Sequence, residues 1–288
     1  MKRTVSILMS GLFGVIFIQT LLVLSCSIFI ASCTSLKTQN SIEPTPGRFG
    51  NRGYIPVETL PNTLTLLPPP PPDDSATFAL DQEISTMSFA LRDTPRWELA
   101  RMDSMMFFPE PVDAFSCSLG APITEEDTPN LYTLLNRTFF DVDWFDKPIK
   151  DQHKRPRPFV VNNEPICTST TATMKKYKSY PSGTASLGWA YALILSEIAP
   201  DKAEALLARG LFYGETGVIC NQCWYSDVVA GRVLGAALVA RLHAEAEFLK
   251  NLLSAKEELA VVRAKGLQPE RDCEAEAAAL TISLKSTP

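Results

Sequence analysis

Apolar residues recur at the three- and four-residue spacing of an amphipathic helix in four separate stretches of the chain. These stretches are Leu131–Phe139, Leu187–Ile198, Leu206–Phe212 and Val229–Leu238. In the last of them the predicted buried face includes Val229, Val233 and Leu234. No stretch alternates apolar and polar residues convincingly as a half-buried strand would. The pattern therefore predicts an all-α domain, a compact helical bundle, over residues 75–249.

Two regions flank this predicted domain. Residues 34–74 are rich in proline, asparagine, threonine and serine and contain the run Pro68–Pro72, a composition typical of an extended polyproline linker. Residues 250–288 are expected to form the C-terminal part, with a charged amphipathic helix within Ala244–Lys265 and a short helix within Arg271–Lys285. We interpret these C-terminal helices as packing or surface elements rather than as a site.

The N-terminus has the features of an export signal. A basic start, Met1–Arg3, is followed by an apolar run from Val5 to Ile30 that holds no charged residue. The run ends in Ile-Ala-Ser-Cys33, the pattern at which bacterial lipoproteins are cut and lipidated, so residues 1–33 are predicted to be a signal peptide with Cys33 as the lipidation site. An uncleaved membrane anchor is the alternative, because the run is long enough to span a bilayer. Both interpretations predict an exported, periplasmic protein attached to the membrane.

The composition narrows the class of protein. A content of 45% apolar and 20% charged residues predicts a packed globular core. Lysine and arginine total 27 against 32 acids, and no basic block is interleaved with aromatic residues, so nucleic acid is not expected as a partner. Any recognition of phosphate should therefore be local. No cluster of ligand residues indicates a metal, no cofactor is expected, and the sequence allows a homo-oligomer without indicating one.

Seven cysteines are present, of which Cys26 lies in the predicted signal and Cys33 is the predicted lipid site. The remainder is an odd number: Cys117, Cys167, Cys220, Cys223 and Cys273. Most of these would pair in an oxidising compartment, but the connectivity stays open. The Cys220-x-x-Cys223 pair is interpreted as a structural disulfide or as two cysteines paired elsewhere. A redox dithiol is an alternative, whereas zinc would need two further ligands that the neighbourhood lacks.

A dense basic segment is the first candidate for chemistry. It holds four cations and a histidine within eight residues: Lys150, His153, Lys154, Arg155 and Arg157. Arginine offers a fork of donors matched to phosphate oxygens, and lysine adds a mobile point charge. The segment therefore predicts an anion site, with a solvated basic turn as the alternative.

A second candidate is Pro181-Ser182-Gly183-Thr184, which directly precedes the apolar helical stretch at Leu187. Such a turn exposes backbone N–H groups at the positive end of the helix dipole, where an anion can bind. An ordinary helix cap is the alternative, because serine and threonine are favoured at that position.

Together with a third segment, these two resemble the signature of the bacterial class A non-specific acid phosphatases, within the phosphatidic acid phosphatase and haloperoxidase superfamily. The first signature element is a lysine, six residues and Arg-Pro, and it is intact from Lys150 to Arg157-Pro158. The second is Pro-Ser-Gly-His, and here Thr184 stands in place of the histidine. The resemblance covers roughly Leu66–Leu249 and implies the all-α fold of that family.

The third signature element is Ser-Arg, five residues, histidine, three residues and aspartate. Here Thr216-Gly217 replaces Ser-Arg, Cys223 stands at the histidine position, and Asp227 is retained. We expect this segment to open the next helix, with Cys223 and Asp227 on one helix face.

The resemblance also implies a role for each position. In the family, the histidine of the third element attacks phosphorus, the aspartate orients it, and the histidine of the second element protonates the leaving alcohol. By position, Cys223, Asp227 and Thr184 are then the catalytic positions. The phosphate-binding positions are Lys150, Arg157, Ser182 and Gly183.

The replaced residues change the expected chemistry. The hydroxyl of Thr184 is too weak an acid to serve as a general acid near neutral pH. Gly217 lacks the charged fork that would balance the phosphate oxygens in the transition state. Cys223 could still be a nucleophile as a thiolate, which Asp227 would disfavour and which the cations Lys150 and Arg157 would favour.

We therefore expect an exported domain that binds phosphate or a phosphorylated small molecule and has lost most or all phosphatase activity. The alternative is an active phosphomonoesterase that uses Cys223 or a compensating residue such as His153. A third hypothesis makes Cys220 and Cys223 a redox pair on an inactive scaffold. His243, in a distant predicted helix, is interpreted as a surface residue.

Overall fold

The computed structural model describes residues 52–168, 178–282 and 284. These residues form helices and connecting turns with no strand among them, which confirms the all-α prediction. The predicted signal, including Cys26 and Cys33, lies outside the described residues, and none of the described helices has the length and apolar composition needed to cross a bilayer.

The helices follow one another along the chain with short connections. The α-helices are α2 (Ala76–Ser88), α3 (Pro95–Asp103), α4 (Glu110–Asp113), α5 (Ser116–Leu119), α6 (Pro129–His153), α7 (Pro158–Asn162), α9 (Gly183–Ile198), α10 (Ala203–Ile219), α11 (Tyr225–Leu242), α12 (Ala246–Ala264) and α13 (Cys273–Leu280). Short 3-10 turns are η1 (Val57–Thr59), η2 (Thr63–Thr65), η3 (Phe89–Leu91) and η4 (Pro200–Lys202).

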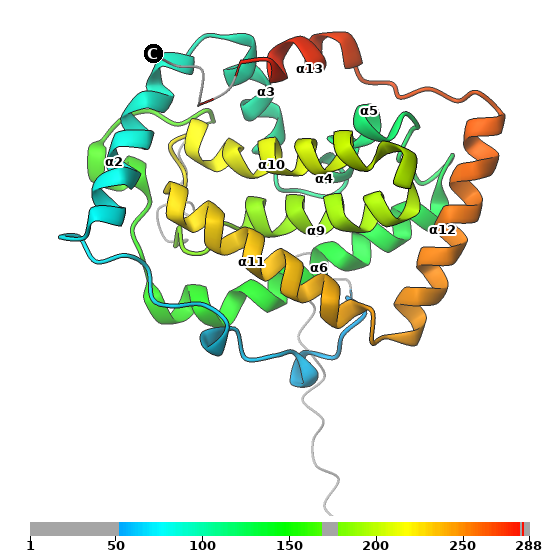
Figure 1. The fold of residues 1–288 in the computed structure, drawn as a ribbon, viewed down its shortest axis with the longest axis horizontal. Coiled ribbons are helices and arrows are strands. Elements are labelled where there is room, and N and C mark those ends of the chain that lie inside the picture. Colours follow the sequence, from blue (N-terminus) through cyan, green and yellow to red (C-terminus); the bar gives the residue numbers. More distant parts are fainter. Residues whose placement is uncertain (1–51, 169–177, 283, 285–288) are drawn as a thin grey trace, which may run out of the picture. The chain divides into compact units, whose positions relative to one another are not determined.

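Helix α9 lies between α10 and α11 (Figure 1). Its side chains Leu187, Tyr191 and Ile194 are fully buried, as expected for a helix that is apolar on most of its surface. Helix α6 packs on α9, and α12 packs on α6. This arrangement places the first turn of α9 beside the first turn of α11 and the last turn of α6.

Two glycines let the backbones beside α9 approach closely. A Cβ atom at Gly231 of α11 would lie 2.4 Å from the carbonyl oxygen of Ser182, and one at Gly210 of α10 would lie 2.4 Å from Cβ of Ala192. Any other residue would clash at either position. The start of α9 is thus held directly against the backbone of α11.

The buried face of α11 differs in part from the predicted one. Val229 and Val233 are 46% and 47% exposed, while Leu234 is fully buried. Helix α11 contacts α9 through Gly231 and Gly235. Glycine has no apolar side chain, so these positions do not stand out in a pattern of apolar residues. The prediction for the two valines was wrong because close backbone packing, rather than apolar side chains, decides which face of α11 turns inward.

Residues 52–74, which we expected to belong to an extended linker, contact the helices. The N–H groups of Tyr54 and Ile55 donate to the two carboxylate oxygens of Asp141 on α6, at 2.8 and 3.0 Å. Tyr54, Ile55 and Leu67 are buried. The described part of the predicted linker is therefore packed onto the helical domain rather than separated from it.

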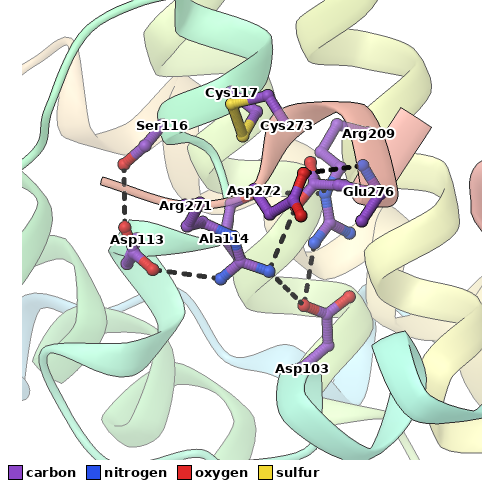
Figure 2. Close-up of a disulfide and its surroundings, with 11 residues drawn as sticks. Asp103, Asp113, Ala114, Ser116, Cys117, Arg209, Arg271, Asp272, Cys273 and Glu276 are labelled. Atoms are coloured by element: carbon purple, nitrogen blue, oxygen red, sulfur yellow. Dashed lines mark hydrogen bonds and ion pairs between the residues drawn. A yellow bond between two sulfur atoms is a disulfide. The ribbon is translucent and has the colours of Figure 1, made fainter. Parts of the chain in front are cut away.

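The C-terminal helix α13 is joined to the domain by a covalent bond and by charges (Figure 2). A disulfide links Cys117 of α5 to Cys273 of α13. Beside it, the fully buried guanidinium of Arg209 on α10 contacts Asp103 at 2.8 Å and Glu276 of α13 at 3.2 Å. Because a buried cation needs such partners, this cluster ties α13 to α3 and α10.

Candidate functional site

The end of α6 directs the basic segment. Lys150 lies in the last turn of α6, is partly exposed, and donates a hydrogen bond from Nζ to the carbonyl oxygen of Pro181. The helix ends at His153, and Lys154 takes up a left-handed conformation with φ of 48°. Arg157 has extended backbone geometry and precedes Pro158, the first residue of α7.

Arg157 reaches from this turn to the turn between α10 and α11. Its Nη1 atom donates to the carbonyl oxygen of Gln222 at 2.8 Å and lies 3.7 Å from Sγ of Cys223. The Arg157 side chain is partly exposed. Burial lowers the pKa of Lys150, and the charge of Arg157 adds to this effect, so the two cations act on the same region.

The first turn of α9 has features of both a helix cap and an anion site, the two interpretations of Pro181-Ser182-Gly183-Thr184. Ser182 is the N-cap, because its Oγ accepts the N–H of Ala185 at 3.3 Å. Its own N–H donates to the carbonyl oxygen of Asp227 at 2.9 Å, which joins the second and third signature elements. Gly183 and Thr184 are the first two helical residues, whose N–H groups have no acceptor within the helix. These N–H groups stay available for an anion at the positive end of α9.

The third segment does not open a single helix, as we expected. Helix α10 continues to Ile219, Cys220 caps it, and Asn221 turns the chain with φ of 57°. Cys223 therefore lies in the turn before α11, and only Asp227 lies in its first turn. The prediction that Cys223 and Asp227 share a helix face was wrong, because the left-handed residue interrupts the helical path between α10 and α11.

Cys223 is a buried thiol, 5% exposed. In addition to its contact with Arg157, Sγ of Cys223 lies 4.0 Å from the carbonyl oxygen of Ser179. A side chain at Gly217 would begin 3.1 Å from Cβ and 3.2 Å from Sγ of Cys223, and 3.6 Å from Oγ of Ser182. A larger residue at position 217 would therefore be in tight contact with the thiol.

The redox-pair hypothesis is contradicted by the disulfides. Cys220 is bonded to Cys167, and Cys223 is a free thiol in the described part of the chain. The bond fixes Cys220 at the end of α10 and leaves no dithiol at this position. The interpretation that a cysteine of this pair is paired elsewhere is confirmed for Cys220.

Asp227 is fully buried and bound on both carboxylate oxygens. Oδ1 accepts from Nη1 of Arg155 at 2.5 Å, and Oδ2 accepts the N–H of Trp224 at 2.8 Å, which caps α11. Among the described residues, no hydrogen bond joins Asp227 to Cys223. Asp227 therefore has structural roles that do not depend on a histidine at position 223.

The basic segment divides into different roles, which the sequence did not reveal. Arg155 is buried and donates from Nη2 to Asp81 of α2 at 2.8 Å as well as to Asp227. Lys154 is exposed. Arg157 contacts the turn that holds Cys223, Lys150 contacts Pro181 before the start of α9, and Arg155 is bound between two buried carboxylates.

A further carboxyl group at the site was missed by the sequence analysis. Asp146 is 2% exposed, and its Oδ1 accepts from Oγ of Ser186 at 3.1 Å. Oδ2 is buried and has no hydrogen-bond partner among the described residues. Burial raises the pKa of Asp146 to about 7, against the opposing effects of Lys150 and Ser186. Its position one turn before Lys150, on the same face of α6, was the available signal.

The two histidines make contacts with residues other than Cys223. The ring of His153 packs against that of Tyr180, with centroids 5.8 Å apart. His243 bonds to Glu197 at 2.8 Å and lies 16 residues after Asp227, roughly 24 Å away at the rise of an α-helix. Neither ring is hydrogen-bonded to Cys223 or Asp227 among the described residues.

Comparison with known proteins gives consistent matches. The model of the PAP2 superfamily matches residues 131–247. A non-specific acid phosphatase of Providencia stuartii is 38% identical over 204 residues, which cover 70% of this chain and 82% of the relative. An acid phosphatase of Zymomonas mobilis is 32% identical over 194 residues, with 67% and 73% covered. A non-specific acid phosphatase of Salmonella typhimurium is 34% identical over 200 residues, with 69% and 80% covered.

Proposed function

The chain belongs to the PAP2 superfamily as a class A acid phosphatase-type protein, and from this premise we propose that it binds phosphate or a phosphorylated small molecule but hydrolyses it slowly or not at all. One observation carries the proposal. The phosphate-binding positions Lys150, Arg157 and Ser182–Gly183 converge on a thiol, Cys223, that has no hydrogen bond to the neighbouring Asp227 among the described residues.

Phosphate binding is supported by three kinds of donor around one turn. Lys150 supplies a mobile ammonium group, Arg157 supplies a guanidinium fork, and the first N–H groups of α9 supply a positive helix end. None of these groups needs the replaced histidines. Binding is therefore expected to survive where turnover does not.

Weak turnover is supported by the missing acid and by the surroundings of the thiol. Thr184, at the general-acid position, cannot protonate a leaving alcohol efficiently. The alternative, in which Cys223 attacks phosphorus, is favoured by the 3.7 Å approach of Arg157 to Sγ, because a cation stabilises a thiolate. It is disfavoured by the burial of the thiol and by Thr184 in place of the histidine that would protonate the leaving group.

The deciding experiment measures hydrolysis of a chromogenic phosphate monoester at mildly acidic pH. We expect turnover by the native protein to lie on the order of 10⁴-fold below that of the Providencia stuartii enzyme, because both histidine functions are lost. The Cys223→Ser variant should have the same residual rate. A Thr184→His, Cys223→His double variant should gain at least about 100-fold in rate. Gly217→Arg is left out because its Cβ would crowd residue 223.

Phosphate affinity, measured by calorimetry, is the second arm. Arg157→Gln should weaken phosphate binding by about tenfold or more, since it removes a charge-assisted contact. Lys154→Gln, an exposed cation three residues earlier, is the matched control and should leave the affinity unchanged.

If the native protein hydrolyses the phosphate monoester rapidly and Cys223→Ser abolishes this activity, the cysteine mechanism replaces our proposal. If phosphate does not bind, the binding function is refuted.

We further propose that the protein acts outside the cytoplasm, attached to the membrane through lipidated Cys33. The apolar run before Cys33 supports export. The disulfides Cys117–Cys273 and Cys167–Cys220 support an oxidising compartment. Labelling of cells with a radioactive fatty acid tests the proposal: the native chain should carry the label, and retention of the label by Cys33→Ser would contradict it.

A further inference from the structure

A buried carboxyl group lies directly beneath the phosphate-binding turn. Asp146 is one helical turn before Lys150 on α6, and its Oδ1 is bonded to Ser186 in the first turns of α9. A side chain at Gly183 would begin 3.7 Å from Oδ2. Oδ2 therefore points at the backbone that would hold the anion, and it has no partner among the described residues.

An unpartnered buried oxygen is costly when it carries charge and much less costly when it carries a proton. Ionised, Asp146 would place a negative charge next to the N–H groups that are to bind a phosphate oxygen. It would also compensate the charge of Lys150 one turn away. Protonated, it removes the repulsion and leaves the ammonium group of Lys150 free to act on the ligand.

The charged groups around Asp146 allow either form near neutral pH. On α6, Lys150 lowers its pKa and Asp143 raises it, while burial is the largest effect and raises it to about 7. From α9, the approaching residues Gly183 and Ser186 carry no charge. Burial lowers the pKa of Lys150, Asp146 opposes this effect, and Arg157 adds to it.

We propose that Asp146 couples anion binding to uptake of one proton, so that the site holds a tetrahedral oxyanion tightly when Asp146 is protonated and weakly when it is ionised. The inference rests on the proposed phosphate-binding function. When an anion binds at a pH above the pKa of Asp146, one proton moves from solvent to the Asp146 carboxylate, and no other covalent bond forms or breaks. Asp146 is a positioning residue, because its buried Oδ2 acts on the ligand through Gly183 and Lys150.

The sign follows from the raised pKa. Below pH 7 Asp146 is largely protonated, and binding is strong. As the pH rises through about 7, the carboxylate forms and binding weakens. The site would therefore release its anion on passing from a mildly acidic to a mildly alkaline medium.

The test measures binding of sulfate to the full-length protein by calorimetry from about pH 5 to about pH 9. Sulfate is tetrahedral and keeps its charge over this range, whereas phosphate titrates and would obscure the result. We expect the affinity of the native protein to fall by up to about tenfold between pH 6 and pH 8, the limit for uptake of one proton by a group with a pKa of about 7. Repeating the titration in buffers of different ionisation enthalpy should show net proton uptake on binding near pH 7.5.

Three variants separate Asp146 from other causes. Asp146→Asn should bind sulfate at pH 8 about as tightly as the native protein does at pH 6 and should show no proton uptake. Ser186→Ala removes the hydrogen bond that lowers the pKa of Asp146, so its midpoint should move to higher pH. Asp151→Asn changes the net charge equally at an exposed position of α6 and should keep the native pH profile.

The outcomes distinguish the inference from the function on which it rests. If sulfate binds but Asp146→Asn keeps the native midpoint, the inference is overturned while the binding function stands. If the pH dependence disappears in Lys150→Met but persists in Asp146→Asn, Lys150 is the titrating group and the inference is again overturned. If neither sulfate nor phosphate binds at any pH, both proposals fail.

Discussion

The residues at positions 217 and 223 limit each other's size. A Cβ atom at position 217 would lie 3.1 Å from Cβ and 3.2 Å from Sγ of Cys223, closer than ordinary van der Waals contact. Both residues replace larger charged or aromatic side chains of the signature that the sequence resembles. The two replacements therefore fit together sterically, and restoring one affects the room for the other.

This steric dependence predicts a coupling between positions 217 and 223. Gly217→Ala should destabilise the native protein by about 1 kcal/mol, because the crowding at Cys223 outweighs the gain in helix propensity. In a Cys223→Gly background the same change should stabilise by about 0.5 kcal/mol, since only the propensity remains. Urea denaturation of the four proteins gives the coupling energy. Additive effects would show that the two positions are independent.

At the scale of elements, α2 is bound to the site by a buried network of charges. Asp81 of α2 accepts from Arg155, and its other oxygen accepts the N–H of Ser226 at 2.7 Å. Arg155 also pairs with Asp227, which caps α11. One arginine from the basic segment thus joins α2 to the start of α11, and its own burial is tolerated because both partners are carboxylates.

Removing one member of this network should be costly. Asp81→Ala is expected to lower the free energy of unfolding by about 3 kcal/mol, because Arg155 stays buried with part of its charge uncompensated. Glu83→Ala on the exposed side of the same helix is the control and should change stability by less than about 0.5 kcal/mol. Equal effects of the two variants, measured by chemical denaturation, would contradict the role of the network.

At the scale of the whole molecule, two disulfides join distant parts of the chain in different places. Cys117–Cys273 closes a separation of 156 residues at α13, beside the Arg209 cluster of Figure 2. Cys167–Cys220 closes 53 residues and holds the end of α10, three residues before Cys223. Only the second bond lies next to the turn on which the phosphate donors converge.

The two bonds should therefore differ in their effect on the site. Replacing both cysteines of either pair by serine is expected to lower stability by about 2–5 kcal/mol, because the unfolded chain gains freedom. The Cys117, Cys273 variant should keep the native phosphate affinity. The Cys167, Cys220 variant should lose about tenfold or more, since Gln222 would no longer hold Arg157 in place. Equal affinities in the two variants would refute this assignment.

The sequence by itself determined the helical class and the order of the signature elements. The spacing of apolar residues predicted α9 and much of α6 and α10, because a helix that packs on one face must repeat its apolar positions at that period. The signature spacing identified Lys150, Arg157 and Asp227 together with the replaced positions Thr184 and Cys223. These features are local along the chain, and so they can be recognised without coordinates.

Only the tertiary structure decided how these residues are used. Contacts between residues far apart in sequence turned Arg155 into a structural ion-pair partner of Asp81 and Asp227, and they paired Cys220 with Cys167 rather than with Cys223. The close approach of α11 to α9 at Gly231 likewise placed the start of α9 beside Asp227. Burial is a property of the packed molecule, and it is the largest of the effects that raise the pKa of Asp146 to about 7.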